Sequence, residues 1–410
     1  MILFLSDLHV ADDPRRNTLD IKALLEALEG QLAANTQDVD CNPKLILLGD
    51  IFEMLKSDVW FELDTRPWSS DRTKVLAATV EIMNRIVRSN SGFFDGLRRL
   101  QTKFALEITY VPGNHDALMG EANHSEARSI LRNALTLSGA GGDKFNSHVI
   151  DLAHGVFALH GHEFDEFNSP PEGNDPFVAG DAVVVEFIAA LARNSAAELG
   201  LDPALGQFDP RLAFLLDIDN VSPHTARNLA LWIEHGLQSL LDNDLRKVEA
   251  AVLAAIRITL ERLTKLFAQS TNVSRVRGAL LTALSKYLYA SPIERLQGFA
   301  SWQAARGDEL QAVEQRVRAL ATEVESGTEA MIDIFVAGHT HLPIAHPFHV
   351  RGNQLTTYLN TGTWRRVFTA SPTLQNATAF RRLYESTLLC VYRKGAGRPR
   401  YEYQRIVRGY

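Results

Sequence analysis

The sequence predicts an α/β protein whose chain is interrupted by an all-helical insertion. Short apolar runs of strand length recur in residues 1–168 and again in residues 331–410. A helical pattern separates the first two runs, which is typical of a β-α-β unit. Residues 169–330 show helical periodicity and almost no strand pattern, so we expect them to form a block of their own.

Five of the apolar runs end at a polar residue. They are ILFLS before Asp7, KLILLG before Asp50, LEITYVPG before Asn114, HGVFAL before His160, and IDIFVAG before His339. Each run is rich in Ile, Val, Leu or Phe, which favours a strand buried in a sheet. The opening β-α-β unit has its helix between the first two runs, where apolar residues lie at helical spacing: Ile21, Leu24, Leu25, Leu28 and Leu32.

Two further pairs of strands are predicted. The segment HVIDLAHGVFALH is expected to form two strands joined at His154 and Gly155. Near the C-terminus, STLLCVYRK and RYEYQRIV are separated by the turn-forming GAGRP, which predicts a closing hairpin.

The insertion begins in the breaker-rich segment SPPEGNDP, residues 169–176. Helices are predicted at 183–199 and 275–288, and a longer one carries a single apolar stripe: Leu245, Val248, Val252, Ile256, Leu260, Leu263 and Phe267. The predicted domains are therefore a core formed by residues 1–168 and 331–410 and a helical insertion, 169–330, that is expected to cap the site.

Composition narrows the class of protein. The chain has 410 residues, 46% of them hydrophobic, and a net charge of −7, which is typical of a globular protein and does not indicate a general nucleic-acid surface. It has two cysteines, Cys41 and Cys390, so a disulfide framework is not expected. No apolar run has the length of a membrane span, and the N-terminus lacks the basic region of a signal peptide. We expect a cytoplasmic protein.

The polar residues after the five runs form a set that could hold metal ions. In open α/β sheets, the loops beyond strand ends are where sites are built. Because alternate residues of a strand face one side, the pairs Asp7/His9 and His339/His341 are each expected to point at one centre. Carboxylates, imidazoles and an amide oxygen suit Mn, Fe or Zn better than Ca. A set of this size suits two metals that share a bridging ligand.

In chain order, the motifs D-x-H, G-D, G-N-H-D, H-G-H and G-H-x-H resemble those of the calcineurin-like metallophosphoesterase superfamily. The resemblance covers residues 1–168 and 331–410 and leaves out the helical insertion. It implies a β-sandwich flanked by helices in the order α-β-β-α. It also implies two divalent transition-metal ions, Mn first, with Fe or Zn as alternatives.

The resemblance assigns a role to each motif residue. It implies that Asp7, His9 and His341 hold one metal, that Asn114, His160 and His339 hold the other, and that Asp50 bridges them. It implies that a hydroxide between the metals attacks phosphorus. His115 would contact the phosphate or assist the leaving group, and Asp116 would orient His115.

Three further residues are candidates for binding substrate. His162 follows the better-matching His160 and is expected to touch substrate or to support a ligand. Arg15 and Arg16 follow the first motif and are candidates for a phosphate contact, with solvated surface as the alternative reading.

The predicted function is hydrolysis of a phosphoester, with a phosphodiester or pyrophosphate of a nucleotide or nucleic acid as the expected substrate. The run GDIFEML departs from the G-D-x-V-D-R-G of the phosphoprotein phosphatases. One alternative is an enzyme of lipid metabolism, since GDIFE and HGHEFD resemble the bacterial UDP-diacylglucosamine diphosphatases; those commonly have Arg where this chain has His115. Another is a subunit of a larger complex, or a homo-oligomer, that uses the helical block as an interaction module.

Overall fold

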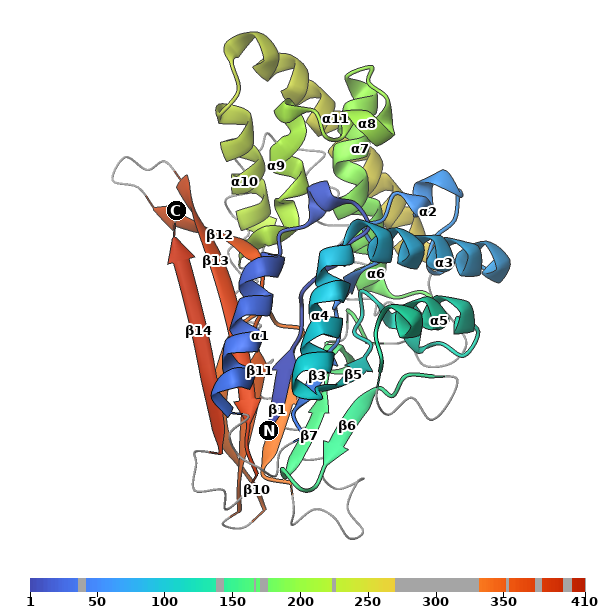
Figure 1. Cartoon of the computed structure of the whole chain (residues 1–410). Helices are drawn as coiled ribbons and strands as arrows, with labels where there is room; N and C mark the ends of the chain where they lie inside the picture. Colours follow the sequence, from blue (N-terminus) through green and yellow to red (C-terminus); the bar gives the residue numbers. More distant parts are fainter. Residues whose placement is uncertain are drawn as a thin grey trace.

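Figure 1 shows the computed structural model of the chain. The structure describes residues 1–35, 42–137, 144–165, 167–169, 176–222, 226–269, 332–351, 354–372, 378–393 and 400–409. Two mixed sheets and a set of helices make up these residues, so the α/β class is confirmed. Among these residues, none of the helices combines the length and apolar character that a membrane crossing requires.

The larger sheet has seven strands in the order β5-β3-β1-β13-β12-β8, with β14 paired to β13. Their bounds are β1 Ile2–Leu5, β3 Lys44–Leu48, β5 Glu107–Val111, β8 Val221–Ser222, β12 Arg366–Pro372, β13 Thr378–Val391 and β14 Tyr401–Gly409. Strands β1, β3 and β5 run parallel, and α1 (Ile21–Asn35) connects the first two, as the β-α-β pattern predicts. The antiparallel pair β13 and β14 confirms the closing hairpin.

The smaller sheet has five strands in the order β10-β11-β9-β7-β6. Their bounds are β6 His148–Asp151, β7 Val156–Leu159, β9 Ile334–Ala337, β10 Pro343–Arg351 and β11 Gln354–Thr361. Strands β6 and β7 are antiparallel, as predicted, and β7 is parallel to β9. A short parallel pair, β2 (Val10–Ala11) and β4 (Phe52–Glu53), lies outside both sheets.

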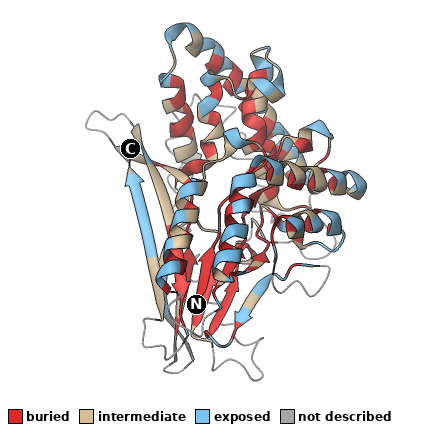
Figure 2. Cartoon of the chain, in the orientation of Figure 1, coloured by how far each residue is buried: buried red, intermediate tan, exposed pale blue. Residues whose placement is uncertain are grey.

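The two sheets pack face to face because their central strands are apolar on both sides. Ile2 and Phe4 of β1 share a cluster with Val156 of β7 and Val336 of β9. The alternate residues of β1 and β3 pack instead against helices. These helices are α1, α3 (Arg72–Ser89), α4 (Ser91–Phe104) and α5 (Ser125–Ala134). Figure 2 shows the central strands buried along their length, whereas these helices are exposed on one side.

The described residues therefore form helix, sheet and sheet layers. On the outer face of the smaller sheet lies a cluster that contains Phe157, Phe335 and Tyr358. Within the described ranges no α-helix belongs to that cluster. The second helical layer of the expected α-β-β-α order stays a prediction.

The described part of the inserted segment, residues 176–222 and 226–269, forms a helical body at one end of the larger sheet (Figure 1). Its elements are α6 Ala179–Val183, a π-helical turn Val184–Ala189, α7 Ala190–Glu198, α8 Pro203–Gly206, α9 Ala213–Leu216, α10 Ala226–Gln238 and α11 Asp242–Gln269. The long helix α11 confirms the predicted apolar stripe, since Val248, Val252 and Ile256 are buried. The helix predicted at 275–288 lies outside the described residues.

The prediction that this segment is all-helical is wrong. Val221 and Ser222 form β8, which pairs in parallel with Phe368 and Thr369 of β12 and so extends the core sheet. Phe368 also belongs to the apolar cluster inside the helical body. A two-residue strand is too short to produce an alternating pattern, so it could not be recognised from the sequence. The segment is built onto the core sheet as well as tethered at its two junctions.

Short helices complete the described structure. They are α2 Val59–Glu62 and five 3₁₀ turns, Pro14–Arg16, Ala117–Gly120, His162–Phe164, Pro210–Leu212 and Ile218–Asn220. The turn Ala117–Gly120 follows the motif that contains His115, the turn His162–Phe164 begins at the last residue of the motif that contains His160, and Ile218–Asn220 directly precedes β8.

Candidate metal centre

The polar motifs meet because five strands end at the same edge of the sandwich. Strands β1, β3 and β5 are parallel neighbours in one sheet, and β7 and β9 are parallel neighbours in the other. The loops after β1 and β3 run side by side, with Asp7 N donating to Gly49 O at 3.1 Å and His9 N donating to Asp50 O at 3.0 Å. Residues far apart in sequence are thereby brought together.

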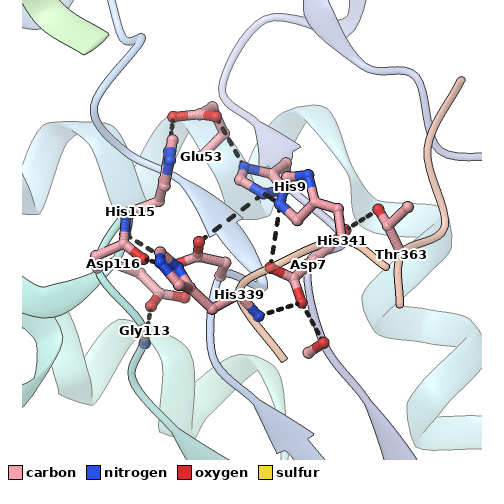
Figure 3. Close-up of polar contacts among 12 residues, drawn as sticks. Asp7, His9, Glu53, Gly113, His115, Asp116, His339, His341 and Thr363 are labelled. Carbon is pink, nitrogen blue, oxygen red and sulfur yellow. Dashed lines mark hydrogen bonds and ion pairs between the residues drawn. The ribbon is translucent and has the colours of Figure 1, made fainter. Parts of the chain in front are cut away.

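Two groups of side chains at this edge could each hold a metal ion. Asp7, His9, Asp50 and His341 form one group, and Asp50, His160 and His339 form the other. Within each group, one potential ligand atom from every residue lies within 4.8 Å of the rest. Asp50 belongs to both groups. Figure 3 shows the carboxylate of Asp7 facing the imidazoles of His9 and His341.

Asn114 adds an amide oxygen to the second group. Its Oδ1 lies 3.3 Å from Nε2 of His160 and 3.1 Å from Nδ1 of His339. His160 is fully buried, and its Nδ1 donates to the carbonyl of Leu48 at 2.9 Å, which leaves Nε2 toward the group. The structure thus brings together all seven predicted metal-ligand residues.

The backbone at these residues is unusual. Among the described residues other than glycine, seven have a positive φ, and five of them are candidate ligands: Asp7, His9, Asp50, His339 and His341. A positive φ is uncommon for residues with a side chain, and such strain concentrates at functional sites. Strand β1 ends at Leu5 and β9 at Ala337, so the pairs Asp7/His9 and His339/His341 both lie beyond their strands. The prediction that strand alternation aims the pairs is therefore wrong, because left-handed turns aim them instead.

Two glycines give the ligands room. A Cβ on Gly49, whose φ is +82°, would lie 2.3 Å from the His160 ring. A Cβ on Gly113 would lie 2.3 Å from Oδ1 of Asp50. Any side chain at these two positions would displace a candidate ligand.

The donor set fits divalent metal ions. Oδ1 of Asp7 is buried and has no hydrogen-bond partner within the described residues, although Nε2 of His341 lies 3.2 Å from it. A cation beside this oxygen would compensate its buried charge. Nε2 of His9 and Nε2 of His341 lie only 3.3 Å apart; the first is 3.9 Å from Oδ2 of Asp50 and the second 3.2 Å from Oδ1 of Asp7. Buried carboxylates with imidazoles are ligands typical of Mn, Fe and Zn.

The pKa values point the same way. Burial alone would raise the pKa of Asp50, but His160 and His115 beside it hold that pKa well below its ordinary value. Burial alone would lower the pKa of His160, but Asp50 and Asp7 raise it to about 10. In the metal-free chain, the protonated ring of His160 therefore supplies the positive charge that these carboxylates attract. A divalent cation would supply that charge when bound, releasing the protons.

No protein-family model matches the sequence, and a search of the curated proteins finds no match either. The interpretation of the site therefore depends on the chemistry of its own residues.

Glu53 is a functional candidate that the sequence prediction missed. Its carboxylate is 1% exposed and contacts two histidines, with Oε2 2.9 Å from Nδ1 of His9 and Oε1 2.8 Å from Nδ1 of His115. Glu53, His9 and His115 form a third group within 4.8 Å. An acidic residue inside the apolar run IFEML was the available indication, because a charge there must be buried with a partner.

Asp116 does not have the predicted role. Its carboxylate accepts hydrogen bonds from the backbone amides of Gly113 at 2.6 Å, Ile51 at 3.0 Å and Phe52 at 3.2 Å. It therefore ties the loop after β5 to the loop after β3. The ring of His115 is instead oriented by Glu53, and its backbone amide donates to Oδ1 of Asp50 at 2.8 Å.

His162 lies beside the second group without belonging to it. Its ring centroid is 5.4 Å from that of His160 and 6.5 Å from that of His339. Burial lowers its pKa to about 4, so the ring is neutral near pH 7. Of the two histidines in HGH, His160 is the one placed among the candidate ligands.

Arg15 and Arg16 lie where the core meets the inserted segment. The guanidinium of Arg15 bonds Asp13 and stacks 3.4 Å from the ring centroid of Phe208. Arg16 contacts Asp58 at 3.1 Å and Gln207 at 2.5 Å. These contacts dock the segment and do not involve the clustered histidines, so a phosphate contact at either arginine stays a prediction.

Proposed function

We propose that the chain is a phosphoesterase that depends on two divalent transition-metal ions, Mn²⁺ first, with Fe or Zn as alternatives. Its proposed substrate is a phosphodiester or pyrophosphate of a nucleotide or nucleic acid. The observation that carries the proposal is that Asp50 belongs to both groups of candidate ligands. A carboxylate shared in this way is suited to holding two metal ions side by side.

Each ion has a proposed set of ligands. Asp7, His9, Asp50 and His341 would hold one, and Asp50, Asn114, His160 and His339 would hold the other. Bound there, the ions would supply Lewis-acid chemistry for the phosphoryl oxygens. The order of the motifs along the chain supports a similarity to the calcineurin-like metallophosphoesterases.

His115 is the proposed proton donor. Hydrolysis of a phosphodiester forms a bond from phosphorus to the oxygen of water and breaks the bond to the leaving oxygen. Water gives up a proton in this exchange, and the leaving oxygen gains one. Because Nδ1 of His115 contacts Glu53, Nε2 is the atom left to face a substrate oxygen.

The surroundings of His115 support this role. Burial alone would lower its pKa, but the charges of Glu53 and Asp50 raise it to about 9, so the ring carries a proton near pH 7. Its side chain is 15% exposed, compared with 3% for His9, so it is the ring that solvent and substrate reach more easily.

The packing of the inserted segment favours an enzyme over a separate interaction module. Buried apolar residues of α7, α10 and α11 share a cluster with Phe368 of the core, so these faces are used within the chain. The segment is proposed to contribute to selection of the substrate.

The proposal is tested with metal-stripped protein and bis-p-nitrophenyl phosphate. Hydrolysis is expected only after Mn²⁺ is added, and it should be lost in Asp50→Asn. A panel of phosphomonoesters, phosphodiesters, nucleotide pyrophosphates and single-stranded DNA then identifies the preferred class. Hydrolysis that is equal with and without metal, or equal in Asp50→Asn, would refute the proposal.

A further inference from the structure

A chain of buried charged side chains connects the inserted segment to the histidines of the candidate site. It starts at Glu53, which contacts His9 and His115, and continues to Lys56, whose Nζ lies 3.0 Å from Oε2 of Glu53. The same Nζ lies 2.5 Å from Oδ2 of Asp219, which belongs to the inserted segment. Oδ2 of Asp219 also lies 2.5 Å from Nη2 of Arg365.

Lys56 holds Glu53 at both oxygens. Its backbone amide donates to Oε1 at 3.3 Å, and its ammonium contacts Oε2. These are the two oxygens that receive His115 and His9. Because an ionised carboxylate only accepts hydrogen bonds, Glu53 holds a proton on Nδ1 of both histidines and orients both rings.

Asp219 is the partner that makes this arrangement favourable. Lys56 is 7% exposed and Arg365 is 4% exposed, and both cations converge on the one carboxylate of Asp219. Arg365 Nη2 also contacts Oδ1 of Asn220 at 2.7 Å. Removing the charge of Asp219 would leave Lys56 with Glu53 as its anionic partner among the contacts described, and Arg365 with the neutral side chain of Asn220. Because burying an uncompensated charge costs free energy, Lys56 would then move, and Glu53, which it contacts, would be displaced with it.

The location of Asp219 is set by the core sheet. It lies in the turn Ile218–Asn220, directly before β8, and β8 pairs with β12 only three residues after Arg365. The inserted segment is thus fastened to the sheet at the point where it delivers Asp219 to Lys56 and Arg365.

We propose that Asp219 is a positioning residue of the candidate site, acting through Lys56 on Glu53 and, through Glu53, on the rings of His9 and His115. The inserted segment thereby completes the site in addition to any contact it makes with substrate. The inference deepens the proposed function, and its expected effect on turnover rests on that function. Its expected effect on the positions of Glu53 and the two rings concerns the metal-free chain.

A matched control lies two residues away. Asp217 also joins the segment to the core, through Nη2 of Arg366 at 2.8 Å, but Arg366 has no contact with Lys56 or Glu53 among those described. Asp217→Asn and Asp219→Asn each remove one carboxylate charge from the same turn. Loosened docking of the segment would affect both variants alike, whereas lost positioning of Glu53 would affect only Asp219→Asn.

The direct measurement is NMR of the metal-free chain labelled with ¹⁵N-histidine. The ring Nδ1–H protons of His9 and His115, assigned with His9→Gln and His115→Gln, are expected to be protected from solvent by Glu53. Asp219→Asn should shift these two signals or lose them to solvent exchange, and Asp217→Asn should leave them as in the parent. Identical spectra for the two Asp variants would overturn the inference.

The kinetic measurement uses the Mn²⁺-loaded enzyme. Asp219→Asn is expected to lower kcat by roughly 10–100-fold, as lost orienting partners of ligands do, with KM close to the parent value. Lys56→Met should show the same loss, and the double variant should be no slower than Lys56→Met because both act along one chain. Additive losses would overturn the inference, as would parent kinetics in Asp219→Asn. If Asp219→Asn does not fold, both the NMR and the kinetic measurements are made on Lys56→Met alone.

A failure of the proposed function can be distinguished from a failure of this inference. A parent chain that hydrolyses no phosphoester with Mn²⁺ would refute the phosphoesterase, while the histidine spectra would still decide whether Asp219 positions Glu53.

Discussion

Oδ2 of Asp165 lies 3.2 Å from Nε2 of His339. This contact turns the other ring nitrogen, Nδ1, toward Oδ1 of Asn114 at 3.1 Å. Asp165 is itself held by Nδ2 of Asn168 at 2.6 Å. The second group of candidate ligands therefore has its own orienting carboxylate, as His9 of the first group has Glu53.

Asp165→Asn is expected to weaken binding of one Mn²⁺ per chain by roughly 10–100-fold, because His339 loses the charged acceptor that fixes its ring. Titration of metal-stripped protein with Mn²⁺ measures this. Asp151→Asn, which removes an equal charge away from the cluster, is the control. Equal Mn²⁺ affinities in Asp165→Asn and the parent would show that Asp165 does not orient His339.

His115→Ala should keep its metal and lose turnover. His115 lies in neither of the two groups that share Asp50, so the Mn²⁺ content should match the parent. A proton donor is typically worth about 10²–10⁴ in rate, and kcat should fall within that range. Loss of metal with unchanged turnover per bound ion would assign His115 to the ligands instead.

Gly113→Ala should disrupt the site through a steric clash with Asp50. The added Cβ would lie 2.3 Å from Oδ1 of Asp50, so the carboxylate must move. We expect a loss of Mn²⁺ affinity together with a lower midpoint of urea unfolding. Gly30→Ala, in helix α1 with no atom within 4 Å of the new Cβ, should instead stabilise the chain by roughly 0.5–1 kcal/mol. Normal Mn²⁺ binding by Gly113→Ala would contradict the packing described.

Asp151 should contribute stability that depends on pH. Hydrogen bonds from His154 at 2.9 Å and Lys44 at 2.7 Å lower the pKa of its carboxyl, against the effect of burial. A lowered pKa gives stability that is present above the unfolded value of about 4 and is lost as the pH falls toward the folded value. Asp151→Asn should therefore cost about 1 kcal/mol at pH 7 and progressively less below pH 4. Urea unfolding of metal-free protein at pH 7 and pH 3 checks this, and a difference that grows at pH 3 would contradict it.

The sequence predicted the parts of the fold that depend on local pattern. The apolar runs before Asp7, Asp50, Asn114, His160 and His339 are all strands, and the stripe from Leu245 to Phe267 is a helix. Strand β8 was not predicted, because pairing with β12, and not its own composition, makes Val221 and Ser222 a strand.

The sequence predicted which polar residues meet at the site but not the contacts that support them. The motif residues carry their chemistry in their identity and order. The role assigned to Asp116 failed because proximity in sequence to His115 does not specify which atoms meet, and its carboxylate binds backbone amides instead. Asp219 could not be found from sequence, since its partner Lys56 lies 163 positions away and only the fold brings them together.

The number of metal ions bound per chain tests the central claim most directly. Metal-stripped protein is loaded with Mn²⁺, freed of excess ion, and measured by elemental analysis alongside Asp50→Asn. Because Asp50 belongs to both ligand groups, we predict two Mn per parent chain and a loss of both in the variant. At most one Mn per parent chain, or a full complement in Asp50→Asn, would contradict a two-metal centre bridged by Asp50.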